Sequence, residues 1–148
     1  MGKISGTKGV SATTKTKTIK QSVFLTAKPA EVYDAILQAK KHSAFTGSKA
    51  TCAPRVGGRF SAYDGYIWGK NLDLVKDQKI VQEWQTTEWP PGTPPSIVEL
   101  NLRGHQGGTE LTMVHCEVPA DQAESYRQGW IDYYWEPLKE YFGRTKKR

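Results

Sequence analysis

The hydrophobic pattern of the chain changes near Thr18, and this change predicts where folded structure begins. Residues 1–17 are rich in Gly, Ser, Thr and Lys and contain almost no large apolar side chain. Burial cannot offset the entropy of ordering such a segment, so we expect a flexible basic tail. From Thr18 on, Ile19, Val23 and Leu25 alternate with polar residues, which is the period-two pattern of a strand.

Two short helices are predicted after this strand. Pro29 suits the first helical position, where its fixed φ and missing N–H cost nothing. The apolar residues that follow share one helical face: Val32, Tyr33, Ile36 and Leu37. A second helix is expected over Lys40–Phe45, with Gly47 ending it.

A long strand-like stretch follows, divided by turn residues. The expected strands are Arg59–Tyr63, Tyr66–Val75, Lys79–Thr87, Ile97–Arg103 and Thr109–Val118. Asp64-Gly65 and Gly107-Gly108 predict two of the hairpins that join them. Consecutive strands joined by short turns form an antiparallel meander.

A long helix is expected to cover one face of this sheet. Asp121 and Glu124 resemble a capping box, Gly143 is a plausible stop, and Pro137 predicts a kink within the helix. Helical spacing aligns the large residues Tyr126, Trp130, Tyr133, Tyr134, Leu138 and Tyr141. The order of elements predicts an α+β fold with helices on one face of an antiparallel sheet.

The net charge of +6 is confined to the two ends of the chain. Lys and Arg number 21 and Asp and Glu 15, but eight of the bases lie in residues 1–18 and 144–148. The region 19–143 therefore holds 13 bases against 15 acids. Because nucleic-acid binders usually carry their charge on a folded face, we expect no specific nucleic-acid partner.

No arrangement of residues points to catalysis, a metal or a cofactor. His42, His105 and His115 fall on separate elements, and Cys52 and Cys116 lack metal-ligand spacing. Phosphate-binding and nucleophile motifs are absent from the sequence. We therefore expect neither an enzyme nor a bound cofactor. The low cysteine content, with no apolar leader or membrane-length run, favours a cytoplasmic protein without a transmembrane segment.

The aromatic content, 11% of the residues, is the most informative feature of the composition. Most aromatic side chains in a small domain belong to the core. A Tyr/Trp stripe on a helix over a curved sheet can also line an apolar groove. By strand parity, Gln82 and His115 share the inward face and could supply its polar groups. His115 could equally be a core histidine bonded to a neighbour.

Several segments resemble a known co-chaperone family. The most specific are GGRF, DGYIWG, IVQEW followed by WPPG, and RQGWIDYYW before FG. Together they resemble the C-terminal domain of the activators of the 90-kDa heat-shock protein ATPase, within the birch-pollen-allergen-like START superfamily. The resemblance covers about residues 18–143, which we expect to form one domain, with 144–148 as a short basic tail.

This resemblance implies a helix-grip fold, in which a curved antiparallel sheet wraps around a long C-terminal helix. It also implies that the space between sheet and helix can hold an apolar ligand. The candidate cavity residues, including the two polar ones named above, are Phe45, Phe60, Gln82, Trp84, Leu100, Met113, His115, Trp130 and Tyr134.

The resemblance implies a non-enzymatic binding protein, a co-chaperone-like partner of a 90-kDa heat-shock-type chaperone. The alternative is a START-like carrier or sensor of an apolar small molecule or lipid. In two-domain members a preceding domain binds the chaperone's middle segment, and residues 1–17 are too short to form it. We therefore expect this chain by itself to stimulate the chaperone ATPase little. We also expect it to be a monomer.

Overall fold

The computed structural model describes residues 15–146. Its strands are β1 (Thr16–Leu25), β2 (Thr51–Cys52), β3 (Arg59–Ala62), β4 (Ile67–Val75), β5 (Lys79–Thr86), β6 (Ser96–His105) and β7 (Gly108–Pro119). Its helical segments are α1 (Pro29–Leu37), α2 (Ala39–Thr46), η2 (Ala120–Gln122), α3 (Ala123–Trp130), η3 (Ile131–Trp135) and α4 (Glu136–Lys146).

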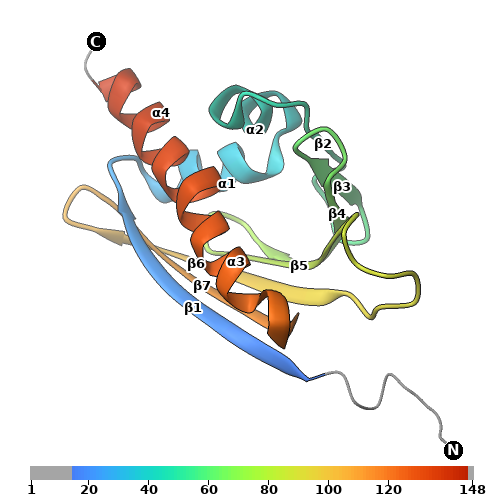
Figure 1. Cartoon of the computed structure of the whole chain (residues 1–148). Coiled ribbons are helices and arrows are strands. Elements are labelled where there is room, and N and C mark those ends of the chain that lie inside the picture. The colour runs from blue at the N-terminus through green and yellow to red at the C-terminus, as the bar shows by residue number, and fades with distance from the viewer. Residues whose placement is uncertain (1–14, 147–148) are drawn as a thin grey trace, which may run out of the picture.

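The strands form one antiparallel sheet of seven in the order β1-β7-β6-β5-β4-β3-β2. Figure 1 shows this sheet curving around the continuous helix made by α3, η3 and α4, with α1 and α2 beside that helix. The first strand, which precedes both short helices in the chain, pairs with the last strand and forms one edge of the sheet. This arrangement confirms the predicted α+β helix-grip fold.

The first strand begins slightly before its predicted start. Thr16 and Lys17 pair with the end of β7, and the backbone N–H of Ala120 donates to the carbonyl of Lys15. Most of the predicted basic tail, residues 1–14, lies outside the described residues. Its flexibility stays a prediction.

The signals predicted for the two short helices are present in the structure. Pro29 occupies the first turn of α1, and the backbone N–H of Lys28 donates to the Glu31 carboxylate at 2.9 Å. The second helix ends at Gly47, whose φ of 76° is the left-handed conformation that glycine adopts without strain.

Two turns and one strand differ from the prediction. The loop between β3 and β4 spans residues 63–66, and Tyr63 and Asp64 both have positive φ. The β6–β7 turn consists of Gln106 and Gly107, one residue earlier than expected. The short strand β2 was not predicted, because two residues are too few to show a periodic pattern.

The C-terminal helix departs from its predicted ends. It begins with the 3₁₀ turn η2, and no side chain caps α3, so the expected capping box is absent. It also continues past Gly143 to Lys146. Just before Pro137 the helix widens into a π turn, η3, in which Glu136 N–H donates to the carbonyl of Ile131. The wider turn accommodates a proline ring that would crowd a regular α-helix.

The core lies between the inner face of the sheet and this helix. Trp84 of β5 and Trp130 of α3 are both buried, with ring centroids 5.9 Å apart, which confirms that they face each other across the two layers. The predicted helical stripe needs two corrections. Tyr133 is 58% exposed, and Phe142 is buried where the pattern placed Tyr141.

Candidate functional site

An aromatic pocket opens between the C-terminal helix and the β3–β4 hairpin. Its volume is about 290 Å³, and one side of it is formed by α3 and η3. Its lining residues are Tyr63, Tyr66, Ile67, Trp84, Ser125, Tyr126, Gly129, Trp130, Tyr133 and Tyr134. The pocket is the strongest candidate for a binding site in the described part of the chain.

Tyr63 connects the hairpin to the helix at the edge of this pocket. Its φ of 50° is unusual for a bulky residue, and the turn continues through Asp64 and Gly65, which also have positive φ. The Tyr63 hydroxyl donates a 2.6 Å hydrogen bond to the backbone carbonyl of Tyr133. Because Pro137 has no N–H, it cannot serve this carbonyl as an α-helical residue would. The tyrosine hydroxyl supplies a donor in its place.

The carboxylate of Glu88 holds two tyrosines of the pocket wall. Its Oε1 accepts hydrogen bonds from the hydroxyls of Tyr66 at 2.7 Å and Tyr126 at 3.1 Å. The Tyr126 hydroxyl also accepts from the Trp89 indole N–H at 2.9 Å and lies 3.0 Å from the Thr86 hydroxyl. Burial raises the pKa of Tyr66 and Tyr126, and the bonds to Glu88 raise them further. Both phenols are therefore neutral at physiological pH.

His115 lies behind the pocket in a fully satisfied chain of hydrogen bonds. Its Nδ1 accepts from the indole N–H of Trp130 at 3.0 Å, so the ring proton is on Nε2. Nε2 donates to the Ser96 hydroxyl at 2.8 Å, and that hydroxyl donates to the carbonyl of Trp84. Burial lowers the pKa of His115 to about 3, so the ring is neutral. This is the core histidine bonded to neighbours that the sequence left as one alternative.

His42 on α2 has the same structural role on the other side of Tyr134. Its Nδ1 donates to the carbonyl of Ile36, and its Nε2 accepts from the Tyr134 hydroxyl, both at 2.9 Å. Burial lowers the pKa of His42 and raises that of Tyr134. Each ring nitrogen of both buried histidines therefore has a partner within the protein, which leaves neither free to exchange a proton with a substrate.

The structure brings three of the candidate cavity residues to the pocket: Trp84, Trp130 and Tyr134. The other six do not line it and are buried elsewhere in the core: Phe45, Phe60, Gln82, Leu100, Met113 and His115. The Gln82 amide donates to Asn71 Oδ1 at 2.9 Å, within the sheet. Ligand binding by any of the nine stays a prediction.

Sequence reasoning missed the hairpin side of the pocket. Tyr63, Tyr66 and Ile67 belong to a turn and its flanks, where strand parity gives no reliable orientation. On the helix, Ser125, Tyr126, Gly129 and Tyr133 were also missed as pocket residues. The available signal was helical spacing: Tyr126 and Tyr133 lie four and three residues from the candidate Trp130, and residues spaced in this way share a helical face.

The Tyr63 phenol is neutral, like those of Tyr66 and Tyr126. Burial and the neighbouring Tyr133 raise the pKa of Tyr63 to about 12, so this phenol also stays neutral. Within residues 15–146, no group of three or more His, Cys, Asp or Glu side chains could hold a metal ion. No helix among the described residues is long and apolar enough to cross a membrane.

Solved structures share this fold. An HSP90 activator from Plasmodium falciparum aligns with a TM-score of 0.79 and 22% identity, covering 85% of this chain and 96% of that one. A Mesorhizobium loti protein aligns with a TM-score of 0.73 and 24% identity over 87% of this chain and 98% of its own. At such identities these likenesses establish the fold alone.

Sequence comparison identifies the family. Activator of 90 kDa heat shock protein ATPase homolog 1 from Homo sapiens is 38% identical over 135 residues, which is 91% of this chain and 39% of the human protein. The Dictyostelium discoideum homolog is 30% identical over 89% of this chain and 34% of its own length. This chain thus spans about two fifths or less of these relatives. The family model for Activator of Hsp90 ATPase homolog 1-like protein matches residues 26–143, so the chain belongs to that family.

Proposed function

We propose that this chain is a non-enzymatic, co-chaperone-like module that binds a 90-kDa heat-shock-type chaperone in the cytoplasm. The observation that carries the proposal is the 38% identity to the human activator across 91% of the chain. The two buried histidines support a binding role, because hydrogen bonds within the domain occupy all their ring nitrogens.

The apolar-ligand carrier is less well supported than the co-chaperone module. Leu100 and Met113 at the centre of the sheet are buried in the core and do not line the pocket. At about 290 Å³, the pocket falls at the lower limit of small-molecule sites, roughly 300–1,000 Å³. A volume this small does not suit a lipid.

A binding titration tests the proposal. Fluorescently labelled protein is titrated with a 90-kDa heat-shock chaperone, with and without a non-hydrolysable ATP analogue, and unlabelled protein serves as the competitor. A single small domain offers at most about 800 Å² of its surface. A second linked site is worth roughly 10²–10⁴-fold in affinity, and this domain tested alone binds through one site, so we expect an affinity no tighter than about 1 µM.

Nucleotide dependence is the second part of the test. A module that prefers one conformational state of the chaperone binds more tightly when nucleotide populates that state. We expect a monomer that binds the nucleotide-loaded chaperone better and stimulates its ATPase little. No detectable binding at a chaperone concentration of about 100 µM, with and without nucleotide, would contradict the proposal. The affinity would then be far weaker than that of a typical specific interface.

A further inference from the structure

We propose that the aromatic pocket binds an organic cation, with an ammonium or guanidinium group as the part recognised. The cation is either a free small molecule or the end of a lysine or arginine side chain of a protein partner. This site does not depend on the co-chaperone function, because the argument uses only the walls, charges and size of the pocket.

The walls consist mainly of aromatic rings in contact with one another. Trp130 is central: its ring centroid lies 5.9 Å from that of Trp84 and 4.9 Å from that of Tyr134. Tyr63 and Tyr133 meet edge to face at 5.6 Å on the hairpin side. Aromatic faces carry negative electrostatic potential and attract cations, most strongly where water is excluded.

Four of the five tyrosine hydroxyls of the lining donate their protons to other groups of the protein. Tyr63 donates to the carbonyl of Tyr133, Tyr66 to Glu88, and Tyr134 to His42. The Tyr126 hydroxyl accepts from Trp89 and donates to Glu88. None of these four hydroxyls therefore has a free proton to donate to an anion in the pocket, whereas the aromatic faces can still attract a cation.

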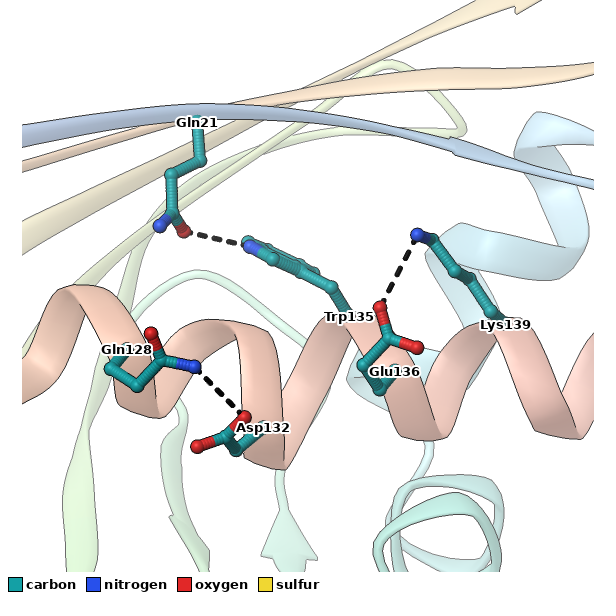
Figure 2. Close-up of polar contacts among 6 residues, drawn as sticks. All are labelled: Gln21, Gln128, Asp132, Trp135, Glu136 and Lys139. Carbon is teal, nitrogen blue, oxygen red and sulfur yellow. Dashed lines mark hydrogen bonds and ion pairs between the residues drawn. The ribbon is translucent and has the colours of Figure 1, made fainter.

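The charge bonded to the pocket wall is negative. None of the lining residues carries a positive charge. The Glu88 carboxylate accepts hydrogen bonds from the lining residues Tyr66 and Tyr126. Along the helix sequence, Glu124, Asp132 and one base, Arg127, lie next to lining residues, and the Arg127 Nε lies 3.5 Å from the Glu124 carboxylate. Figure 2 shows Asp132 on the side of the helix away from Gln21 of β1, next to Gln128, from which it accepts a hydrogen bond. The Glu88 charge and the lack of a base among the lining residues favour a cation.

A choline titration with a neutral control tests the charge preference. The control is 3,3-dimethylbutan-1-ol, which has the shape of choline without its charge. Binding is followed by the fluorescence of Trp84 and Trp130 and by backbone amide chemical shifts around Gly129. We expect choline to bind about 2- to 30-fold more tightly than the alcohol, the range that cation–aromatic attraction gives. Equal or tighter binding of the alcohol, or no binding of choline, would overturn the proposal.

Three substitutions localise the effect. Glu88→Gln keeps an acceptor for Tyr66 and Tyr126 but removes the charge, so choline should bind several-fold more weakly while the alcohol is unaffected. Tyr133→Leu removes an exposed ring of the wall and should weaken choline binding too. Phe24→Leu, a matched change of an exposed ring outside the pocket, should alter neither titration. Unchanged choline binding in both pocket variants would contradict the site.

A competition experiment separates the two sources of the cation. Saturating choline is added to the labelled protein in complex with the chaperone. Displacement of the chaperone identifies a lysine or arginine side chain of the partner as the natural occupant. A complex that stays intact while choline binds to it assigns the pocket to a free small cation. The choline titration itself stands whether or not the chaperone binds.

Discussion

Acidification should destabilise the folded protein through His115. Trp130 N–H donates to the Nδ1 of the buried ring, so a proton can be added there only by breaking that bond inside the core. The unfolded chain holds this histidine in water with its ordinary pKa of 6.5, whereas the folded pKa is about 3. Between these values the unfolded state binds more protons, so stability is present above pH 6.5 and is lost as the pH falls toward 3.

The size of this effect follows from the two pKa values. Once the pH is well below 6.5, each further unit of acidification lowers the free energy of unfolding by up to about 1.4 kcal/mol, because protonation stabilises the unfolded state. From pH 6.5 to 4.5, His115 alone should therefore remove about 2 kcal/mol of stability. His42, whose pKa is also lowered by burial, adds a loss of the same sign.

Urea unfolding monitored by tryptophan fluorescence at several pH values between 7.5 and 4.5 measures this loss. His115→Gln keeps an acceptor for Trp130 and a donor for Ser96 but cannot titrate, so its stability should depend less on pH. His105→Gln, the same change at an exposed histidine in the β6–β7 hairpin, is the matched control for the substitution itself. An unchanged pH dependence in His115→Gln would refute the reasoning. So would an NMR titration of the wild-type ring with a pKa near 6.5, which needs no variant to fold.

Five further variants test the packing by thermal and urea unfolding. Trp130→Ala should cost roughly 3–5 kcal/mol, because it removes a buried ring from the centre of the aromatic cluster; a loss below about 1 kcal/mol would mean the site is not core. Gly69→Ala would place a Cβ against the backbone carbonyl oxygen of Glu83 in β5 and should destabilise the sheet. Gly143→Ala in α4 meets nothing within 4 Å and should stabilise the helix by up to about 1 kcal/mol. Deleting residues 1–14 should barely shift the melting temperature, whereas deletion of 1–17 removes the carbonyl that Ala120 uses and two strand pairs, and should lower it measurably.

The layers of the fold could be predicted because each large element repeats its pattern several times. The alternation around Ile80, Gln82 and Trp84 assigns one face of β5 to the core, and the structure buries all three. The ends of elements were harder to predict. At Asp121 a 3₁₀ turn replaces the expected helix cap. The chain is already held to the first strand where it leaves β7, because the backbone N–H of Ala120 donates to the carbonyl of Lys15.

Only three of the ten pocket residues were predicted from the sequence. Trp84 and Trp130 come from regular elements whose inward faces can be read from the sequence. Tyr63 could not be placed, because its positive φ and its bond to the Tyr133 carbonyl depend on a turn and a distant helix meeting in space. Hydrogen bonds between residues 70 positions apart leave no local pattern in the sequence.

The π turn before Pro137 sets the phase of the second half of the helix. Buried residues recur every fourth position, at Tyr126, Trp130, Tyr134, Leu138 and Phe142. A uniform α-helix turns about 100° per residue, so over these 16 positions such a stripe would drift by about 160°, almost to the opposite side. The wider turn advances less per residue and offsets part of this drift. The π turn before Pro137 thus lets one buried stripe pack against both the sheet beneath α3 and the short helices beside α4.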